Sequence, residues 1–331
     1  MRRFFVTGAT GFIGGRLVER LVAEIPGCEV RCLVRRLSPE LEALGTVQVA
    51  GDLDRDLSHE LTDVDVVFHC AAMVSDWGTV AEIRRANVAG TARLLAAAGH
   101  ARVGRFVHLS TTDVYGHPGG GPHDETTPVA PRFRNWYSQS KAEAEAEVWR
   151  AGAAGLPVTI VRPATVYGPG SVKVIGEIAR ALRARQMIVI RRGRTVVGLC
   201  YIDNLVDALL AAARRREAIG EVFNLADDEP TTWRELLDDL ASGLGCPPVG
   251  FALPYSLATM LALTCELGYR RLRRATGMTL PPLLSRQAVQ LMAVDQRFAT
   301  EKARHLLAYQ PRVRYRDEGL ARTLAWLRGR E

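Results

Sequence analysis

The chain has 331 residues, which is long enough for one large α/β domain or for a domain with a smaller lobe. Hydrophobic residues make up 47% and charged residues 24% of the sequence, and this balance excludes a globally disordered chain. The net charge is +7, but the basic residues are scattered, with no basic tail and no aromatic-interleaved stripe. A nucleic-acid partner is therefore not expected.

The six cysteines contain no CxxC pair and the seven histidines have no ligand spacing, so no metal site is predicted. The first residues, MRRFFVTGATGFIG, lead directly into a predicted strand and a glycine loop, with no room for a signal peptide. We therefore expect a cytoplasmic protein with reduced cysteines. The longest apolar stretch, residues 251–267, contains Pro254 and Glu266 and is too short to span a bilayer.

Apolar segments of strand length alternate with helical patterns through much of the chain. Helices are predicted at residues 14–23, 80–100 and 204–215, and residues 187–202 read as a hairpin-like pair of strands. Continuous apolar strands joined by helical crossovers indicate a parallel sheet covered on both faces, so we predict a doubly wound α/β fold of the Rossmann type. The predicted strands are residues 3–7, 30–34, 46–50, 64–70, 105–110, 157–163 and 221–226.

The alternation of strands and helices weakens after residue 170, and this change defines the predicted domains. Residues 1–170 are expected to form the Rossmann core, to which residues 198–229 return. Residues 171–197 and 230–331 are expected to form a smaller, mostly helical lobe. This lobe would close over the carboxyl edge of the sheet, where doubly wound folds bind ligands.

A glycine-rich turn follows the first predicted strand and opens the first helix. Gly8, Gly11 and Gly14 have the spacing that permits a tight turn, a close approach of backbone to a pyrophosphate, and close packing of helix on strand. The strand–turn–helix context makes this motif specific for dinucleotide binding. The predicted cofactor contacts in the turn are Gly8, Thr10, Gly11, Phe12, Ile13 and Gly14.

The end of the second strand indicates which dinucleotide binds. An acidic residue there would hold a ribose 2′-hydroxyl, whereas arginine accommodates a 2′-phosphate. The sequence places Arg35 and Arg36 at this point, so NADP(H) is favoured over NAD(H). Two solvated arginines in an arginine-rich chain are the alternative.

A tyrosine and a lysine four positions apart, Tyr137 and Lys141, share one face of a predicted helix. The chain has only three lysines, and chance would give about 0.07 Tyr-x-x-x-Lys matches in it. A neighbouring ammonium lowers the pKa of a phenol toward the working range of a general acid/base. A compact point charge also reaches ribose hydroxyls that the broad guanidinium fork of arginine would not.

Hydroxyl groups end the fifth predicted strand, where Ser110, Thr111 and Thr112 stand at the carboxyl edge of the sheet. One of them is expected to help hold a substrate oxygen. The alternative role for these side chains is to cap the turn that follows the strand.

Eight segments occur in the order found in extended short-chain dehydrogenases/reductases, and they span residues 5–208. They are TGATGFIG, GDL, CAA, NVAGT, STTDVYG, YSQSK, RPATVYGPG and YIDNLVDA. The chain therefore resembles this family, and its tail is similar to the 3β-hydroxysteroid dehydrogenase and sterol dehydrogenase branch. The resemblance implies a Rossmann fold and an NAD(P)-dependent oxidoreductase acting on CH–OH groups.

The resemblance also implies roles for individual residues. It makes Tyr137 the general acid/base, Lys141 its electrostatic partner and ribose ligand, and Thr111 the hydroxyl that holds the substrate oxygen. Asn87 is expected to brace the sheet near the site. The further cofactor contacts implied are Asp52 and Leu53 at adenine, Ala71 and Ala72 on the adenosine and ribose side, and Pro163 and Val166 at the nicotinamide end.

The predicted function is that of an NADP(H)-dependent ketoreductase or alcohol dehydrogenase acting on a bulky hydrophobic ring ketone, steroid-like or polyketide-like. A nucleotide-sugar epimerase is the alternative, since it shares the same core. Sugar dehydratases resemble one another in a Thr-Asp-Glu stretch, and Thr112 stands here where their acid would be. This difference argues against dehydration but not against epimerisation. A third alternative, a non-catalytic NADP-sensing protein, usually has a damaged Tyr/Lys pair, whereas the pair here is intact.

Residues 251–276 predict an apolar helix that ends in an arginine cluster. Three alternatives stay open for this helix. It packs on its own lobe, or its apolar face lines a substrate pocket together with Met73 and Trp77, or it makes a weak peripheral membrane contact. The expected substrate residues are Met73, Trp77 and Thr112. A small-molecule substrate is the expected partner, and a homodimer is compatible with the sequence.

Overall fold

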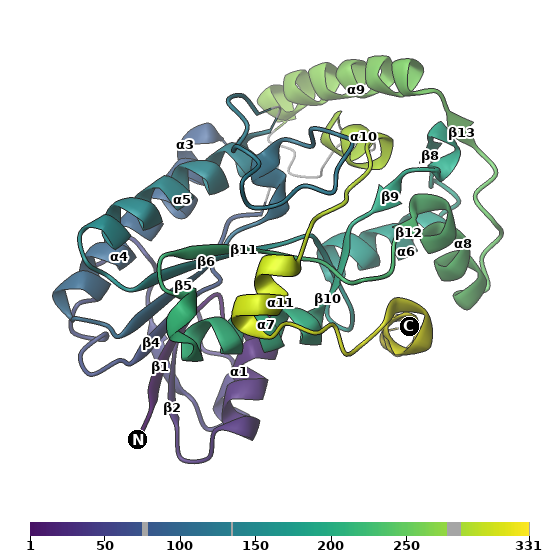
Figure 1. The fold of residues 1–331 in the computed structure, drawn as a ribbon. Coiled ribbons are helices and arrows are strands. Elements are labelled where there is room, and N and C mark those ends of the chain that lie inside the picture. Colours follow the sequence, from purple (N-terminus) through teal and green to yellow (C-terminus); the bar gives the residue numbers. More distant parts are fainter. Residues whose placement is uncertain (75–78, 134, 277–285, 331) are drawn as a thin grey trace.

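The computed structural model describes residues 1–74, 79–133, 135–276 and 286–330. Its centre is a seven-stranded parallel sheet in the order β11-β6-β5-β4-β1-β2-β3, which confirms the predicted doubly wound Rossmann fold (Figure 1). The strands are β1 (Arg3–Thr7), β2 (Glu29–Val34), β3 (Val47–Ala50), β4 (Val66–His69), β5 (Arg105–Leu109), β6 (Val158–Pro163) and β11 (Glu221–Leu225).

Helices cover both faces of the sheet, and successive side chains of β1 pack against opposite faces. Phe4 and Val6 pack into the hydrophobic cluster of the α1 and α7 face, whereas Phe5 packs into the cluster under α4 and α5. Because the central strands β4, β5 and β6 are buried throughout, apolar residues suit both of their faces, and this accounts for the continuous apolar runs. The covering helices are α1 (Phe12–Glu24), α4 (Gly90–His100), α5 (Trp136–Ala153) and α7 (Ile202–Arg214).

The helix expected over residues 80–100 is present, and its middle is a π-helical turn: it consists of α3 (Val80–Arg84), η1 (Arg85–Ala89) and α4 (Gly90–His100). The hairpin expected over residues 187–202 is wrong, because its short strands β8, β9 and β10 pair with β13, β12 and β7 instead of with each other. These partners come from other parts of the chain, so the local pattern could not reveal them.

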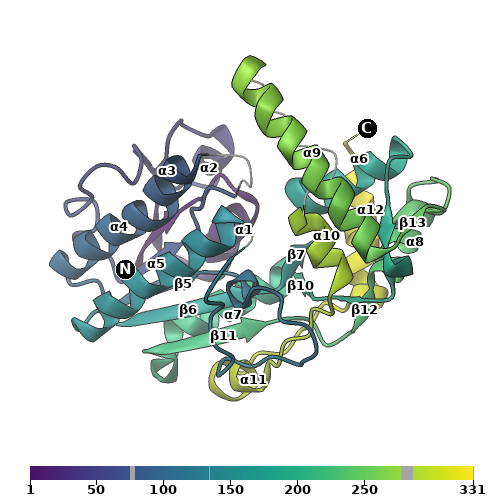
Figure 2. The same ribbon diagram turned by 90° about the horizontal axis from the view of Figure 1, so that it is seen from above.

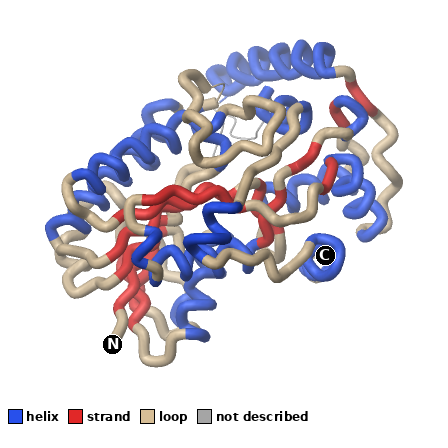
Figure 3. Tube along the Cα trace, viewed as in Figure 1, coloured by secondary structure: helices blue, strands red, loops and turns tan. Residues whose placement is uncertain are grey.

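The remaining elements lie mainly beyond the carboxyl edge of the sheet, and most of them are helical (Figures 2 and 3). In the described ranges no helix is long and apolar enough to cross a membrane. The elements are α2 (Pro39–Ala43), η2 (Thr112–Tyr115), β7 (Thr165–Tyr167), η3 (Val172–Gly176), α6 (Glu177–Arg183), β8 (Val189–Ile190), η4 (Arg191–Gly193), β9 (Val196–Val197), β10 (Leu199–Tyr201), η5 (Arg216–Ala218), β12 (Thr231–Thr232), α8 (Trp233–Gly243), β13 (Ala252–Leu253), α9 (Tyr255–Thr276), α10 (Arg286–Ala293), α11 (Glu301–Leu307), η6 (Tyr315–Gly319) and α12 (Leu320–Arg328).

Candidate active site

The glycine turn after β1 lies at the carboxyl edge of the sheet. Gly8 has a φ of +73°, a left-handed conformation that favours glycine, and its carbonyl accepts a hydrogen bond of 2.9 Å from the Gly11 amide. A Cβ on Gly14 would lie 2.2 Å from the same carbonyl. A side chain at position 14 would therefore push α1 away from β1, as the sequence predicted for the third glycine.

The turn also packs against the end of β4, where two predicted cofactor residues follow. A Cβ on Gly8 would lie 2.8 Å from the Ala71 amide nitrogen, and that amide donates a 3.2 Å hydrogen bond to the Thr7 hydroxyl. Ala71 and Ala72 are half-buried beside this junction. The structure therefore brings the glycine turn and the alanine pair together.

The start of α1 has the properties of an anion site. The helix begins at Phe12 after Gly11, with no capping side chain and no acidic residue in its first turn. Its 13 residues direct a partial positive charge toward the turn, which fits the pyrophosphate of a dinucleotide. Phe12 itself is held in place, because its ring packs against the glycine backbone at position 170.

The predicted adenosine-side residues follow β2 and β3. Arg35 and Arg36 come directly after β2, and both side chains are exposed. Within the described residues, neither guanidinium has a hydrogen bond or an ion pair. Asp52, also exposed, accepts a 2.9 Å hydrogen bond from the Asp54 amide, and Leu53 is half-buried. The two arginines are thus free to bind a phosphate at this edge.

Lys141 is buried at the centre of the candidate site. The Asn135 side chain accepts a 2.7 Å hydrogen bond from the Ser138 amide and so caps α5, which places Tyr137 in the first turn and Lys141 one turn later. The Lys141 side chain is 3% exposed, and Nζ donates a 2.6 Å hydrogen bond to the Leu109 carbonyl at the end of β5. The ammonium is thereby fixed next to the strand that leads into Thr111.

Burial lowers the pKa of Lys141 from 10.5 to about 8, and the charge of Glu145 partly opposes the shift. At neutral pH the side chain still carries its proton. A charge with little water around it acts strongly on its neighbours. Lys141 can therefore lower the pKa of a phenol one turn away.

Two histidines beneath Lys141 were missed by the sequence reasoning. His69 and His108 are paired on adjacent strands with their rings 5.3 Å apart, and His108 Nε2 lies 3.4 Å from Lys141 Nζ. Burial, with the charge of Lys141, lowers the pKa of His69 to about 3 and that of His108 well below its usual value. Both rings are therefore neutral. A histidine near the end of each of two neighbouring strands was the available signal.

Hydrogen bonds hold the first of these rings. The Thr7 hydroxyl lies 2.7 Å from His69 Nδ1, and the Thr91 hydroxyl lies 2.8 Å from Nε2. The Thr91 hydroxyl also donates to the Asn87 carbonyl at 2.6 Å, and so links the ring to the π-helical turn. A chain of contacts thus runs from the end of β1 through His69 to η1.

Asn87 joins the end of β4 to the start of α5. Its Oδ1 accepts from the Met73 amide at 2.7 Å, and its Nδ2 donates to the Ser140 hydroxyl at 2.9 Å. The Ser140 hydroxyl in turn donates to the Tyr137 carbonyl at 2.7 Å. Asn87 is 2% exposed. This bridge fixes the first turn of α5 relative to the sheet.

The predicted hydroxyl residues have different surroundings. Thr111 is half-buried, and its Oγ1 accepts a 3.2 Å hydrogen bond from the Asp113 amide, so it caps η2. Thr112 and Ser110 are buried, and the Ser110 hydroxyl has no partner among the described residues. Tyr137 is half-buried at the start of α5. Of the three hydroxyls, Thr111 is the one that keeps exposed surface.

The other predicted residues lie around this centre. Pro163 ends β6 and is buried, Val166 is half-buried in β7, and Met73 is half-buried after β4. Trp77, the second predicted substrate residue besides Met73, lies outside the described residues. The structure places Met73 beside the Asn87 bridge, and thus near the first turn of α5.

A buried ion pair supports α5 from below. The Glu145 carboxylate accepts hydrogen bonds of 2.9 and 2.5 Å from Nε and Nη2 of Arg162. Arg162 Nη1 donates to the Tyr115 hydroxyl at 2.9 Å, and this hydroxyl donates to Asn224 Oδ1 at 2.8 Å. Glu145 lies one turn after Lys141, so the network holds α5 against β6 and η2.

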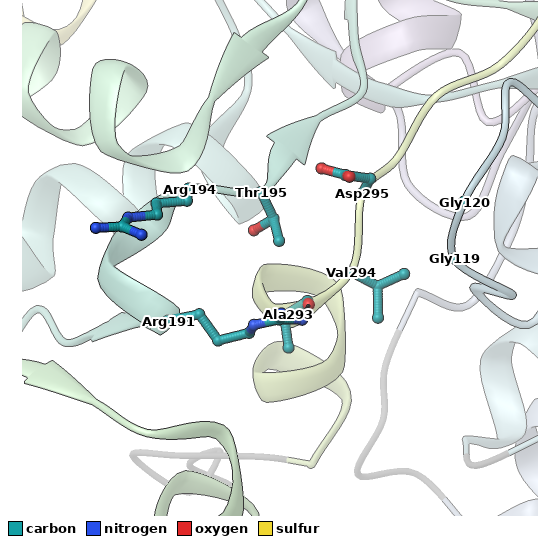
Figure 4. A pocket seen from close by; sticks show the side chains of 8 residues that line it. All are labelled: Gly119, Gly120, Arg191, Arg194, Thr195, Ala293, Val294 and Asp295. Atoms are coloured by element: carbon teal, nitrogen blue, oxygen red, sulfur yellow. Dashed lines mark hydrogen bonds between the residues drawn. The ribbon is translucent and has the colours of Figure 1, made fainter.

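A pocket of about 460 Å³ opens between the loop after η2, η4 and the segment after α10 (Figure 4). Arg191 and Arg194 lie on its η4 side, and Gly119 and Gly120 lie on the facing loop. Arg191 donates a 3.0 Å hydrogen bond to the Ala293 carbonyl. The pocket lining includes none of the residues that the sequence singled out.

The lowered pKa of Lys141 predicts a pH dependence of stability. The folded value of about 8 lies below the unfolded value of 10.5, so the unfolded chain binds more protons between these two pH values. The free energy of unfolding therefore rises with pH across this window. Without cofactor, the wild type should gain about 2 kcal/mol more than Lys141→Met between about pH 7.5 and pH 10. Denaturant titrations measure this gain, and equal gains in both proteins would contradict the assignment.

Comparisons with known proteins show which family the chain resembles. The model of the NAD dependent epimerase/dehydratase family matches residues 4–226. The chain is 34% identical to a 4-hydroxy-2-methyl-3-oxo-4-farnesyl-3,4-dihydroquinoline-1-oxide ketoreductase of Stigmatella aurantiaca, over 95% of this chain and 94% of that protein. It is 31% identical to a 2-alkyl-3-oxoalkanoate reductase of Stenotrophomonas maltophilia (strain K279a), over 98% of both chains. Relatives named 3β-hydroxysteroid dehydrogenases also match, at 30% identity.

Among solved structures, the dTDP-glucose 4,6-dehydratase DesIV of Streptomyces venezuelae, with NAD and TYD bound, has a TM-score of 0.79 and 26% identity. The match covers 99% of this chain and 97% of that chain. The predicted resemblance and enzyme class are confirmed, so the protein is an NAD(P)-dependent enzyme acting on CH–OH groups. The chain belongs to the NAD dependent epimerase/dehydratase family, within the extended short-chain dehydrogenases/reductases.

Proposed function

We propose that this protein is an NADP(H)-dependent ketoreductase that acts on a bulky, hydrophobic ring ketone. The observation that carries the proposal is the buried ammonium of Lys141, which is fixed to the Leu109 carbonyl at 2.6 Å, one helical turn after Tyr137. Such a charge stabilises a phenolate and so prepares Tyr137 for proton transfer at a carbonyl oxygen. Relatives named ketoreductases support the same reaction class.

In the proposed reaction, a bound nicotinamide supplies the hydride. Tyr137 gives its hydroxyl proton to the ketone oxygen as negative charge develops there, and Thr111 donates a hydrogen bond to the same oxygen. Lys141 stabilises the phenolate that remains. The Asn87 bridge keeps Tyr137 in position, because it fixes the first turn of α5 through Ser140.

The NADP(H) preference is proposed from the exposed Arg35 and Arg36, which have no partner among the described residues. Each charge-assisted hydrogen bond to a 2′-phosphate contributes about 1.5–3 kcal/mol. Replacing both with alanine is therefore expected to weaken NADPH binding far more than NADH binding, as measured by titration of cofactor fluorescence. An equal loss for the two cofactors would mean that these arginines do not bind the phosphate.

We also propose that residues 1–170 and 198–229 form the cofactor-binding core and that the remaining segments form the substrate lobe. The return of β11 to the edge of the main sheet supports this division. Thr112, Met73 and Trp77 are proposed as substrate neighbours. A homodimer and a cytoplasmic location stay predictions.

A nucleotide-sugar epimerase is the second candidate, and one observation favours it. Arg191 and Arg194 are two cationic side chains on one pocket, and a diphosphate needs such groups. Asp295 on the same pocket and the hydrogen bond from Arg191 to Ala293 weaken this reading. Thr112, which stands where sugar dehydratases have an acid, argues against dehydration but not against epimerisation.

Calorimetric titration of the NADP-bound protein separates the two candidates. The ketoreductase proposal expects UDP and dTDP to bind no better than millimolar. A double variant, Arg191→Ala with Arg194→Ala, serves as the control for the arginine pocket. Tight binding of either nucleotide by the wild type, lost in this variant, would overturn the proposal in favour of the epimerase.

A further inference from the structure

Helix α9 buries small side chains and exposes large apolar ones, which is the reverse of an ordinary surface helix. Between residues 255 and 269 its buried positions are Ala258, Ala262, Glu266 and Tyr269, which follow one stripe of the helix and face the protein. Two alanines, a carboxylate and a tyrosine therefore occupy the face that usually carries leucine. The Glu266 carboxylate accepts two 2.8 Å hydrogen bonds from the backbone amide and Nε of Arg286, which tie this face to α10.

Large apolar side chains cover the opposite face. Met260 is 57% exposed and Leu267 is 51% exposed, and they lie among further exposed apolar residues of the same helix. No charged side chain stands on the outward face between residues 255 and 269, all of which are described. The other exposed apolar side chains are Tyr255, Leu257, Leu261 and Leu263 on the helix and Phe251 before it. Exposed apolar side chains gathered on one helix face, with the uncharged Ser256 and Thr264 among them, indicate an interaction site.

The position of α9 in the molecule leaves this face accessible. The helix lies at the periphery, packed on α10, and its far end extends beyond its neighbours (Figures 1 and 2). In the described residues no helix can span a bilayer, so the surface suits contact along a membrane plane and not insertion across it.

The charge of the helix indicates what covers the face. Directly after the apolar part, the sequence has arginine at positions 270, 271, 273 and 274, all within α9. Arg271 is exposed and follows Leu267 by one helical turn on the outward side. An apolar face with a basic flank matches the acyl boundary and the anionic headgroups of a bilayer. The net charge of the whole chain, +7, attracts the protein to the same anionic surface.

We propose that α9 seats the protein on the surface of an anionic lipid bilayer, with the outward apolar side chains in the acyl boundary and Arg271 among the headgroups. The proposal does not depend on the ketone substrate, because it concerns binding alone. A failure of catalysis would leave it standing, and a failure of lipid binding would leave the proposed reaction standing.

The test is co-sedimentation of the full chain with vesicles of phosphatidylcholine and phosphatidylglycerol. Binding is expected, weaker on pure phosphatidylcholine and at high salt. Met260→Gln with Leu267→Gln should lower the partition coefficient about ten-fold or more. Arg271→Glu should reduce the preference for the anionic vesicles. The matched control is Val47→Gln with Ile219→Gln, whose native side chains are similarly exposed at 47% and 45%, and it should bind like the wild type.

The four substituted apolar side chains are exposed, so all these variants should fold, and equal melting temperatures check this. No binding to the anionic vesicles, or binding that Met260→Gln with Leu267→Gln leaves unchanged, would overturn the proposal. Sedimentation velocity without lipid then tests whether the face joins two copies of the chain. A dimer that this double variant abolishes, together with no vesicle binding, would assign the face to a second copy of the chain.

Discussion

Tyr137→Phe is expected to lower turnover by about a hundred-fold or more, because the variant loses the group that moves the proton at the substrate oxygen. The ring stays, and the helix cap at Asn135 and the Ser140 hydrogen bond to the residue 137 carbonyl do not involve the phenol oxygen. NADPH binding should therefore persist. Steady-state kinetics with a reducible ketone, together with NADPH titration, measure both effects. Turnover near that of the wild type would contradict the role of Tyr137.

Lys141→Arg is a sharper companion to that variant, since it keeps the positive charge. The space around Lys141 is closed, with Nζ 2.6 Å from the Leu109 carbonyl and 3.4 Å from His108 Nε2. A planar guanidinium is larger than an ammonium group and would displace these neighbours. Turnover should fall substantially although the charge remains. An active Lys141→Arg protein would show that charge alone is needed at this position.

Arg162→Leu is expected to destabilise the protein by about 3–5 kcal/mol, because it leaves the Glu145 carboxylate buried without its partner. The double variant Glu145→Leu with Arg162→Leu should recover much of this loss, since it removes both charges from the interior. Arg180→Leu is the matched control. Arg180 pairs with Glu177 on the exposed surface of α6, where an ion pair contributes at most about 1 kcal/mol.

Denaturant titration measures all three free energies of unfolding. A small effect of Arg162→Leu, similar to that of Arg180→Leu, would contradict the account of the buried network. A double variant less stable than the single one would show that packing around the pair matters more than its charge.

The parts of the site that the sequence predicted are those set by local patterns. The glycine turn has its three glycines within one strand–turn–helix unit, and Tyr137 and Lys141 are four positions apart on one helix. The strands were predicted because a sheet covered on both faces selects continuous apolar runs. In these cases the residues that make the feature are neighbours in the sequence, so their spacing alone predicts it.

The parts that were not predicted depend on contacts between distant segments. His69 and His108 meet only because the register of β4 and β5 places them opposite each other. Arg162 and Glu145 meet because β6 lies beneath α5, which no spacing reveals. The short strands of residues 187–202 find their partners far along the chain.

For helix α9 the sequence does not show which face is buried. Its apolar residues occur around much of the helix, so periodicity does not tell which face is buried. Packing against α10 uses Ala258 and Ala262, which permit close approach, and the larger side chains are left outside. The alternatives of a packed helix, a pocket wall and a membrane contact could therefore not be separated from the sequence.

The most direct test of the ketoreductase proposal is the fate of the cofactor with a lipophilic ring ketone. A reductase oxidises one NADPH for each alcohol formed, whereas an epimerase returns its cofactor to the starting state in each cycle. The screen should include steroid, polyketide and sugar ketones, with UDP-glucose as the comparison. We expect stoichiometric NADPH oxidation with a ring ketone and no change in UDP-glucose. Conversion of UDP-glucose to its epimer without net cofactor consumption would contradict the proposal.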